Sequence, residues 1–349
     1  MNDFHALKIA AVDTLTPNAV ALTFEVPENL KNTFAFTAGQ YITIKHTVNG
    51  EELRRAYSIS SAPSSGKLTV GIKKVPKGTF SVYANENIKA GDVLEVMPPE
   101  GRFVFEKNSE AKNIAAFAAG SGITPIISIA QTVLESHPES TFVLVFGNQS
   151  PEEAMYLRAV QELQDRYTNR FFTQHVYSRS QEENALFGRI ETSTVNFIIK
   201  NKFKETSFDA FYLCGPEEMI TSVSDTLKTN GIAEDKIFFE LFTSSDTEDT
   251  LAEELEGKTT LEVTVDDEVF SLSMDKKTLV LDAVLKENIN APYSCQGGVC
   301  SSCIARITEG KAEMVKNQIL TDGEVAEGFI LTCQAHPLTS TLKVDYDDV

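Results

Sequence analysis

Four cysteines in the last fifth of the chain have the spacing of a metal centre. Cys295, Cys300 and Cys303 form a C-x4-C-x2-C pattern, and Cys333 stands apart with 29 residues intervening. This is the ligand spacing of a plant-type [2Fe–2S] cluster. A loop around such a cluster must bring bare backbone close to it, and Gly297 and Gly298 allow that approach. The pattern predicts a centre that transfers one electron at a time.

A structural zinc site is the competing interpretation of the same four cysteines. Structural zinc sites usually combine two paired C-x2-C knuckles, whereas this chain has one such pair. Cys214 is the fifth and last cysteine and lies far from the others in the sequence. Four grouped ligands and one odd thiol do not resemble a disulfide framework. We therefore favour iron–sulfur over zinc and expect a reducing, cytoplasmic setting.

A second group of residues could bind a flavin. A flavin needs an aromatic face, a hydroxyl near its reactive nitrogen and a cation for its phosphates, and Tyr57, Ser58 and Arg55 could supply them. Arg55 and Tyr57 are two residues apart and share one face of a strand. The residues expected to complete the site are Ile72, Lys73, Val75, Gly78, Thr79, Phe80 and Ser81. The Gly78 turn could offer N–H groups to a pyrophosphate. An exposed edge strand with a tyrosine remains the alternative.

A glycine turn that follows a buried strand and opens a helix suggests nucleotide binding. Its residues are Gly120, Ser121, Gly122, Thr124 and Pro125. Glycines at this point let backbone amides approach a dinucleotide phosphate, and proline suits the first helical turn. The turn lacks the full G-x-G-x-x-G fingerprint, since position 125 is proline. A plain tight turn is the alternative.

Two further segments should lie at the carboxyl ends of strands, where open α/β sheets bind ligands. Cys214-Gly215-Pro216 precedes one helix, and the alternative for Cys214 is an ordinary core position. Ser178-Arg179 ends another strand. A hydroxyl beside a guanidinium suits the phosphate monoester on the ribose of NADP, whereas a plain surface arginine is the alternative.

The order of strands and helices predicts three domains. Residues 1–106 consist of short strands with turn signals between them, which is typical of an antiparallel β-barrel. Residues 107–242 alternate strand and helix, including a charged helix over 152–167, and this predicts a parallel sheet. Residues 243–257 form an acidic segment expected to be an extended linker. Residues 258–349 begin with a hairpin across Asp266-Asp267, continue with a helix over 278–288, and hold the cysteine loop.

The charge and the missing motifs exclude several functions. The net charge of −19 argues against a nucleic-acid partner. Residues 243–349 hold 8 Lys and Arg against 21 Asp and Glu, a balance compatible with steering onto a basic protein surface. No uninterrupted apolar stretch reaches 18 residues, so no membrane association is expected. The sequence also lacks G-x-S-x-G, H-E-x-x-H and Walker A strings, and its five histidines show no metal spacing.

Taken in order, these motifs resemble the ferredoxin–NADP reductase-like flavoproteins that carry a C-terminal plant-type ferredoxin domain of the β-grasp type. The resemblance spans essentially the whole chain. It implies that Tyr57 packs on the isoalloxazine and that Ser58 bonds near flavin N5. It implies that Cys214 lies near the nicotinamide and that Ser178-Arg179 selects NADPH. It also places the segment Glu240-Leu241-Phe242 where relatives often carry a residue that covers the flavin, with Phe242 as the expected binding residue.

The predicted function is an NADPH-dependent reductase that uses FAD and a [2Fe–2S] cluster. Tyr57, Ser58 and Cys214 are the residues expected at the reacting centre. The domain order is similar to the reductase components of multicomponent oxygenases, so an oxygenase is the expected electron acceptor. Phthalate-type reductases share that order but use FMN, which leaves FMN as the alternative flavin. A general ferredoxin or cytochrome reductase and a non-catalytic redox sensor are the alternative functions.

Overall fold

The computed structural model describes residues 4–48, 50–106, 113–242 and 249–349 and divides the chain into two compact units. Residues 4–242 form one unit, and the segment from Thr243 to Val349 belongs to the other. The first unit holds the two predicted N-terminal domains, which are called the barrel lobe and the sheet lobe below. The predicted domain boundaries near residues 107 and 243 fall on residues outside the described ranges.

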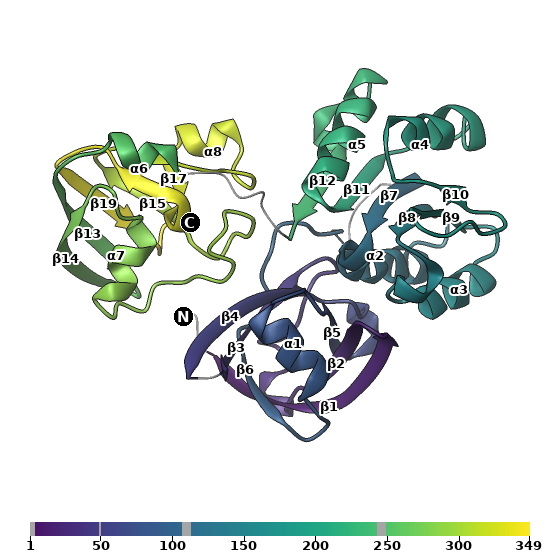
Figure 1. The fold of residues 1–349 in the computed structure, drawn as a ribbon, viewed down its shortest axis with the longest axis horizontal. Coiled ribbons are helices and arrows are strands. Elements are labelled where there is room, and N and C mark those ends of the chain that lie inside the picture. The colour runs from purple at the N-terminus through teal and green to yellow at the C-terminus, as the bar shows by residue number, and fades with distance from the viewer. Residues whose placement is uncertain (1–3, 49, 107–112, 243–248) are drawn as a thin grey trace. The chain divides into compact units, whose positions relative to one another are not determined.

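The barrel lobe is a six-stranded antiparallel sheet in the order β4-β3-β6-β1-β2-β5 (Figure 1). A bridge between Ile59 and Val70 joins its two outer strands and closes the barrel. Apolar side chains that alternate along the strands fill the interior, with Leu7, Ile42 and Ile44 fully buried. The strands are β1 (His5–Thr16), β2 (Ala19–Glu25), β3 (Tyr41–Val48), β4 (Glu51–Ser58), β5 (Leu68–Lys73) and β6 (Val93–Val96).

One helix in this lobe was not anticipated from the sequence. Helix α1 (Thr79–Glu86) begins directly after Gly78 and packs on β5, β3 and β2. Its buried residues are Phe80, Ser81 and Ala84, and its short length leaves little helical periodicity for a sequence pattern to reveal. Two 3-10 turns complete the lobe: η1 (Glu28–Leu30) and η2 (Pro63–Ser65).

The sheet lobe has the predicted parallel architecture, with strand order β10-β9-β8-β7-β11-β12. Helices α2 and α3 cover one face of the sheet, and α4 and α5 cover the other (Figure 1). The elements are β7 (Asn113–Ala119), η3 (Gly120–Gly122), α2 (Ile123–Ser136), β8 (Thr141–Asn148), η4 (Pro151–Glu153), α3 (Leu157–Arg166), β9 (Phe171–Tyr177), β10 (Leu186–Phe187), α4 (Thr192–Asn196), η5 (Phe197–Lys202), β11 (Ala210–Gly215), α5 (Glu217–Thr229), η6 (Glu234–Lys236) and β12 (Ile237–Leu241).

The helix expected over residues 152–167 is shorter than predicted. A 3-10 turn occupies Pro151–Glu153, and the α-helix begins only at Leu157. Ala154 is extended and Tyr156 is left-handed, with φ 59°, so neither backbone conformation continues a right-handed helix. The sequence pattern was wrong here because the chain turns to bring Tyr156 toward the barrel lobe.

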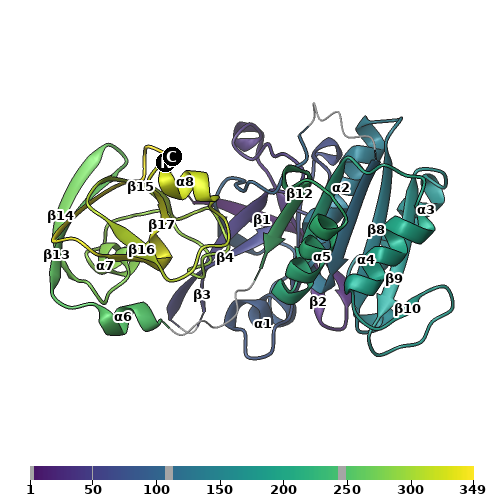
Figure 2. The ribbon, with the colours of Figure 1, turned by 90° about the horizontal axis from the view of Figure 1, so that it is seen from above.

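The second unit is a five-stranded sheet, order β14-β13-β19-β15-β17, with helix α7 packed beneath it (Figure 2). The predicted hairpin across Asp266-Asp267 is present, and both aspartates have positive φ. The elements are α6 (Thr250–Glu254), β13 (Lys258–Val265), β14 (Glu268–Asp275), α7 (Val280–Lys286), β15 (Ile304–Glu309), β16 (Ala312–Met314), α8 (Asp322–Ala326), β17 (Phe329–Leu331), η7 (Thr332–Gln334), β18 (Ala335–Pro337) and β19 (Thr341–Asp345).

The prediction of an extended linker through residue 257 is wrong over its second half. Helix α6 occupies Thr250–Glu254, and the Asp249 carboxylate caps it by accepting from the Ala252 N–H. The other oxygen of Asp249 lies 2.9 Å from Nε2 of the fully buried His336. Charge repulsion within the acidic segment is therefore outweighed here by a cap and a buried partner. Residues 243–248 of the predicted linker lie outside the described ranges.

Candidate functional site

Strand β4 and the start of α1 bring the predicted flavin residues together. The Tyr57 ring lies 5.8 Å from the Phe80 ring between centroids, so the strand and the helix meet at this aromatic pair. Burial raises the pKa of the Tyr57 phenol, and the nearby Arg55 charge only partly offsets that rise. The phenol therefore stays protonated at neutral pH, while Arg55 is exposed to solvent. An aromatic face suits the flavin ring, and an exposed cation suits the flavin phosphates.

The turn before α1 has the geometry that the pyrophosphate prediction needs. Gly78 is the N-cap of the helix, and a Cβ added there would lie 2.5 Å from Ser81 Oγ. That Oγ accepts from the Val75 N–H, which fixes the turn. The first-turn N–H groups of a helix have no partners within it, and they carry the positive end of its dipole. Thr79 and Phe80 lie in this first turn, as the pyrophosphate prediction requires.

Ile72 and Lys73 end strand β5 beside the same helix. The Asn85 side chain on α1 donates to the Ile72 carbonyl, which ties helix and strand together. The Lys73 Nζ extends toward the sheet lobe and lies 3.7 Å from where a Cβ on Gly120 would be. A cation from the barrel lobe is thus placed beside the glycine turn of the sheet lobe.

The glycine turn and the Cys214 segment are in direct contact. A Cβ on Gly122 would lie 2.1 Å from the Cys214 carbonyl oxygen, so no other residue type fits that position unchanged. Neighbouring strands β7 and β11 end at this point, where the strand order of the sheet reverses. That reversal is the usual ligand crevice of open parallel sheets. The Ser121 carbonyl accepts from Thr124 Oγ1, and Pro125 follows in the first turn of α2.

Gly215 and Pro216 continue from Cys214 into helix α5. A Cβ on Gly215 would lie 2.7 Å from the Met219 side chain, so this glycine too sits under close packing. Pro216 is the N-cap of α5. The Cys214 thiol is fully buried, and burial, followed by the influence of Glu240, raises its pKa. The thiol is therefore neutral at physiological pH.

Glu240 belongs to the segment expected near the flavin, but the sequence gives it no role of its own, and only the structure makes it a candidate site residue. It lies opposite Cys214 in the β11–β12 register, and its Oε2 accepts from Ser58 Oγ at 3.1 Å. Burial raises the pKa of this carboxyl to about 8, although the Ser58 hydrogen bond lowers it in part. Ser58 and Glu240 are 182 residues apart, and no local sequence signal could have paired them. The contact joins the flavin strand to the end of the sheet lobe.

Ser178, Arg179 and Phe242 occupy less enclosed positions. The N–H groups of Ser178 and Arg179 donate to the Asn148 and Gln149 carbonyls, which extends the parallel pairing past the end of β9. The Arg179 side chain is exposed at the carboxyl edge of the sheet. Phe242 follows β12 and packs half-buried against the sheet-lobe core.

The cysteine loop and the 3-10 turn η7 bring the four cysteines together in the second unit. Cys300, Cys303 and Cys333 are almost fully buried, and Cys295 is partly exposed. Hydrogen bonds from the Cys300 and Cys333 thiols, supported by backbone N–H groups of Gly297 and Val299, lower the pKa of Cys295. The Gly297 N–H lies 3.3 Å from Cys295 Sγ, as expected for a loop that donates to cluster sulfur. Four convergent thiols suit iron–sulfur ligation.

A hydrogen-bonded brace holds the cysteine loop in place. The Thr332 N–H and hydroxyl both donate to the Cys303 carbonyl, at 3.1 and 3.0 Å. The buried Tyr346 hydroxyl in turn donates to Thr332 Oγ1. Gly298 has φ +71°, and a Cβ there would meet Gln334 and the Lys316 carbonyl. No three His, Cys, Asp or Glu side chains of the described residues surround a single ion position, and a two-iron cluster with two thiolates per iron needs no such triplet.

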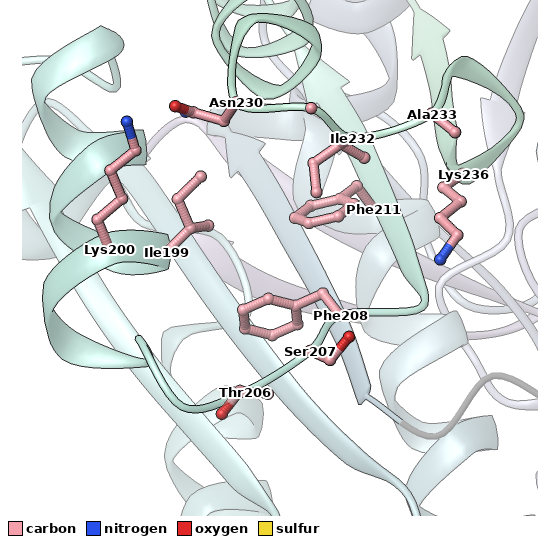
Figure 3. Close-up of a pocket in the computed structure, with 11 residues that line it drawn as sticks. Ile199, Lys200, Thr206, Ser207, Phe208, Phe211, Asn230, Ile232, Ala233 and Lys236 are labelled. Carbon is pink, nitrogen blue, oxygen red and sulfur yellow. The ribbon is translucent and has the colours of Figure 1, made fainter.

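An open pocket of about 350 Å³ lies at the opposite end of the parallel sheet (Figure 3). Phe208 and Phe211 line it where β11 begins, and Ala233 and Lys236 lie before β12. Open parallel sheets bind ligands at their carboxyl ends, and this pocket lies at the amino ends. It is therefore separate from the site formed by the glycine turn and Cys214.

Comparison with known proteins supports the same division of the chain. The description "Oxidoreductase FAD-binding domain" matches residues 6–105, and "Oxidoreductase NAD-binding domain" matches residues 117–225. The description "2Fe-2S iron-sulfur cluster binding domain" matches residues 263–338. The chain is 36% identical to one of the subunits of the 1,2-phenylacetyl-CoA epoxidase of Escherichia coli, over 99% of each chain. The chain belongs to the three-domain iron–sulfur flavoprotein reductases.

Other members of this reductase family are similar along nearly the whole length. The ferredoxin reductase component of 3-ketosteroid-9-alpha-monooxygenase from Rhodococcus rhodochrous is 31% identical over 97% of this chain and 96% of its own. The structure of phthalate dioxygenase reductase has the same fold, with a TM-score of 0.63 at 22% identity over 98% of both chains. These matches confirm the predicted fold class and the FAD, nicotinamide and [2Fe–2S] cofactors, and they favour iron–sulfur over zinc.

The reductase family also fixes the kind of reaction. The chain is an NAD(P)H-dependent flavin and iron–sulfur oxidoreductase of the type that serves oxygenase systems. That result excludes the non-catalytic redox sensor considered from the sequence. Within the part of the chain that the structure describes, no helix is long and apolar enough to span a membrane.

Proposed function

We propose that this reductase takes electrons from NADPH and delivers them to the oxygenase component of a phenylacetyl-CoA epoxidase. The observation that supports the reaction best is the Ser58–Glu240 contact at 3.1 Å, which brings the flavin strand and the nucleotide-binding end of the sheet together. The acceptor is proposed from the 36% identity to the epoxidase protein of E. coli. The segments around Ser178-Arg179, residues 239–242 and Cys333 also resemble that type of reductase. We place the protein in the cytoplasm, since NADPH and free thiols require a reducing compartment.

Each group of site residues has its own task in this function. When bound, FAD supplies the chemistry that accepts a hydride from NADPH and releases single electrons to the cluster. Tyr57 would stack on the isoalloxazine, with Arg55 and the N-terminus of α1 on its phosphates. Ser58 and Cys214 would line the reacting centre, with Glu240 as a protonated carboxyl that can move a proton through Ser58 Oγ. Cys295, Cys300, Cys303 and Cys333 would hold the [2Fe–2S] cluster.

The NADPH preference is proposed for Ser178 and Arg179. Their place at the carboxyl edge of the sheet, with an exposed guanidinium, suits a ribose phosphate. Arg179→Ala should lower kcat/KM for NADPH by about 10- to 100-fold, the usual loss of a charge-assisted hydrogen bond. The value for NADH should change less than about threefold. Arg158→Ala is the matched control, because Arg158 is an exposed arginine of the same lobe that pairs with Glu162.

Equal losses of kcat/KM for NADPH and NADH would show that Ser178 and Arg179 do not bind the ribose phosphate. The acceptor is tested separately, by measuring NADPH-driven product formation with a purified phenylacetyl-CoA epoxidase oxygenase component. Reduction of cytochrome c without any turnover of that oxygenase would favour the alternative of a general reductase. The two measurements are independent, so the proposed NADPH preference and the proposed oxygenase acceptor can be refuted separately.

A further inference from the structure

Tyr156 links the two lobes of the first unit from an unusual backbone conformation. It precedes α3 with φ 59° and ψ 16°, in the left-handed region that residues with a side chain rarely adopt. Its hydroxyl lies 2.7 Å from Ser60 Oγ, which follows strand β4 of the barrel lobe. Burial raises the pKa of this phenol, so it remains a neutral hydrogen-bonding group. The left-handed backbone of Tyr156 thus accompanies a side-chain hydrogen bond to Ser60, 96 residues away in the sequence.

The ring of Tyr156 also rests on the flavin-binding strand. A Cβ added to Gly71 of β5 would lie 2.9 Å from Tyr156 Cε2 and Oη and 2.8 Å from Thr124 Cγ2. The Tyr156 and Thr124 side chains therefore both pack against the backbone of Gly71 in the barrel lobe. Thr124 belongs to the glycine turn of the sheet lobe, and Ile72 and Lys73 follow Gly71 directly. The contact therefore lies between the two cofactor-binding segments.

Hydride transfer is sensitive to the separation of these segments. Donor and acceptor atoms must approach to about 3–3.5 Å, and a displacement of about 1 Å can cost 100-fold in rate. We propose that Tyr156 is a positioning residue that holds the glycine turn against strand β5 and so sets the approach of nicotinamide to flavin. The hydrogen bond to Ser60 orients the ring, and the bare Gly71 backbone sets how close the lobes come. Tyr156 itself touches neither reacting atom in this role.

The first test is Tyr156→Phe in the full holoprotein, because it removes one hydroxyl and keeps the ring. Stopped-flow reduction of the flavin should slow about three- to tenfold with both NADPH and NADH, the usual effect of one neutral hydrogen bond. The long-wavelength charge-transfer absorption of the nicotinamide–flavin complex should weaken. Flavin content and nucleotide Kd should stay within about twofold of wild type. Tyr167→Phe, at the far end of α3, is the matched control.

Two further variants test the same proposal from the barrel-lobe side of the contact. Ser60→Ala should slow flavin reduction as Tyr156→Phe does, and the double variant should be no slower than either single variant. Gly71→Ala should slow reduction more, since the added methyl group forces the lobes apart. If Tyr156→Phe lowers only the melting temperature while the reduction rate and charge-transfer band stay at wild-type values, Tyr156 is merely structural. Additive effects of the two hydroxyl deletions would also overturn the proposal.

Discussion

Glu240 is a buried carboxyl whose replacement by glutamine gives a quantitative test of the site. The side chain is 8% exposed and accepts from Ser58, and its pKa of about 8 stands well above the ordinary 4.5. Between these two pH values the folded protein binds one proton more than the unfolded chain. The free energy of unfolding therefore falls as pH rises through this window, by about 1.4 kcal/mol for each pH unit and about 5 kcal/mol in total.

Glu240→Gln should remove this dependence, because the amide has nearly the same shape and does not titrate. The wild-type protein should lose stability relative to the variant from pH 5 to pH 8, and the difference should level off above about pH 8.5. Urea unfolding curves, monitored through the release of flavin, measure that difference in the free energy of unfolding. Infrared spectra of wild type minus variant should show a protonated carboxyl band that disappears with a midpoint near pH 8. A stability difference independent of pH, or no such band at pH 6, would refute the assignment.

Two other substitutions test the cluster and the nucleotide crevice. Cys300→Ser should abolish reduction of one-electron acceptors through the [2Fe–2S] centre, while flavin reduction by NADPH is largely kept. Visible and EPR spectra report the cluster, and stopped-flow kinetics report flavin reduction. Loss of flavin reduction as well would contradict the separate roles of the flavin site and the cluster. Gly122→Ala should raise the KM for nicotinamide nucleotides at least tenfold or prevent folding, because its methyl group would lie 2.1 Å from the Cys214 carbonyl oxygen. Gly323→Ala is the control for a glycine replacement, because a Cβ there would come no closer than 3.9 Å to Thr321 Oγ1. Wild-type kinetics in Gly122→Ala would show that the crevice opens more easily than its packing indicates.

The motifs with fixed local spacing could be predicted from the sequence, and the contacts between distant segments could not. The C-x4-C-x2-C pattern of Cys295, Cys300 and Cys303 and the Gly120–Gly122 turn each carry their geometry within a few residues. Glu240 became a site residue only through folding, because its partner Ser58 lies on another lobe. Tyr156 looked like part of a continuous amphipathic helix, since a side-chain pattern does not report a left-handed backbone.

The acidic linker shows the same limit on sequence prediction. Its many carboxylates predict mutual repulsion and an extended chain. That prediction takes no account of the buried His336 imidazole, which lies far along the sequence. His336 is fully buried, with Nδ1 3.0 Å from the Lys276 carbonyl and Nε2 2.9 Å from Asp249. The partner of Asp249 lies 87 residues away in sequence, so composition alone could not identify it.

The Asp249–His336 hydrogen bond fastens the start of helix α6 to the interior of the iron–sulfur domain. Because the FAD-binding domain and the iron–sulfur domain belong to one chain, dilution of the protein does not separate the electron donor from its first acceptor.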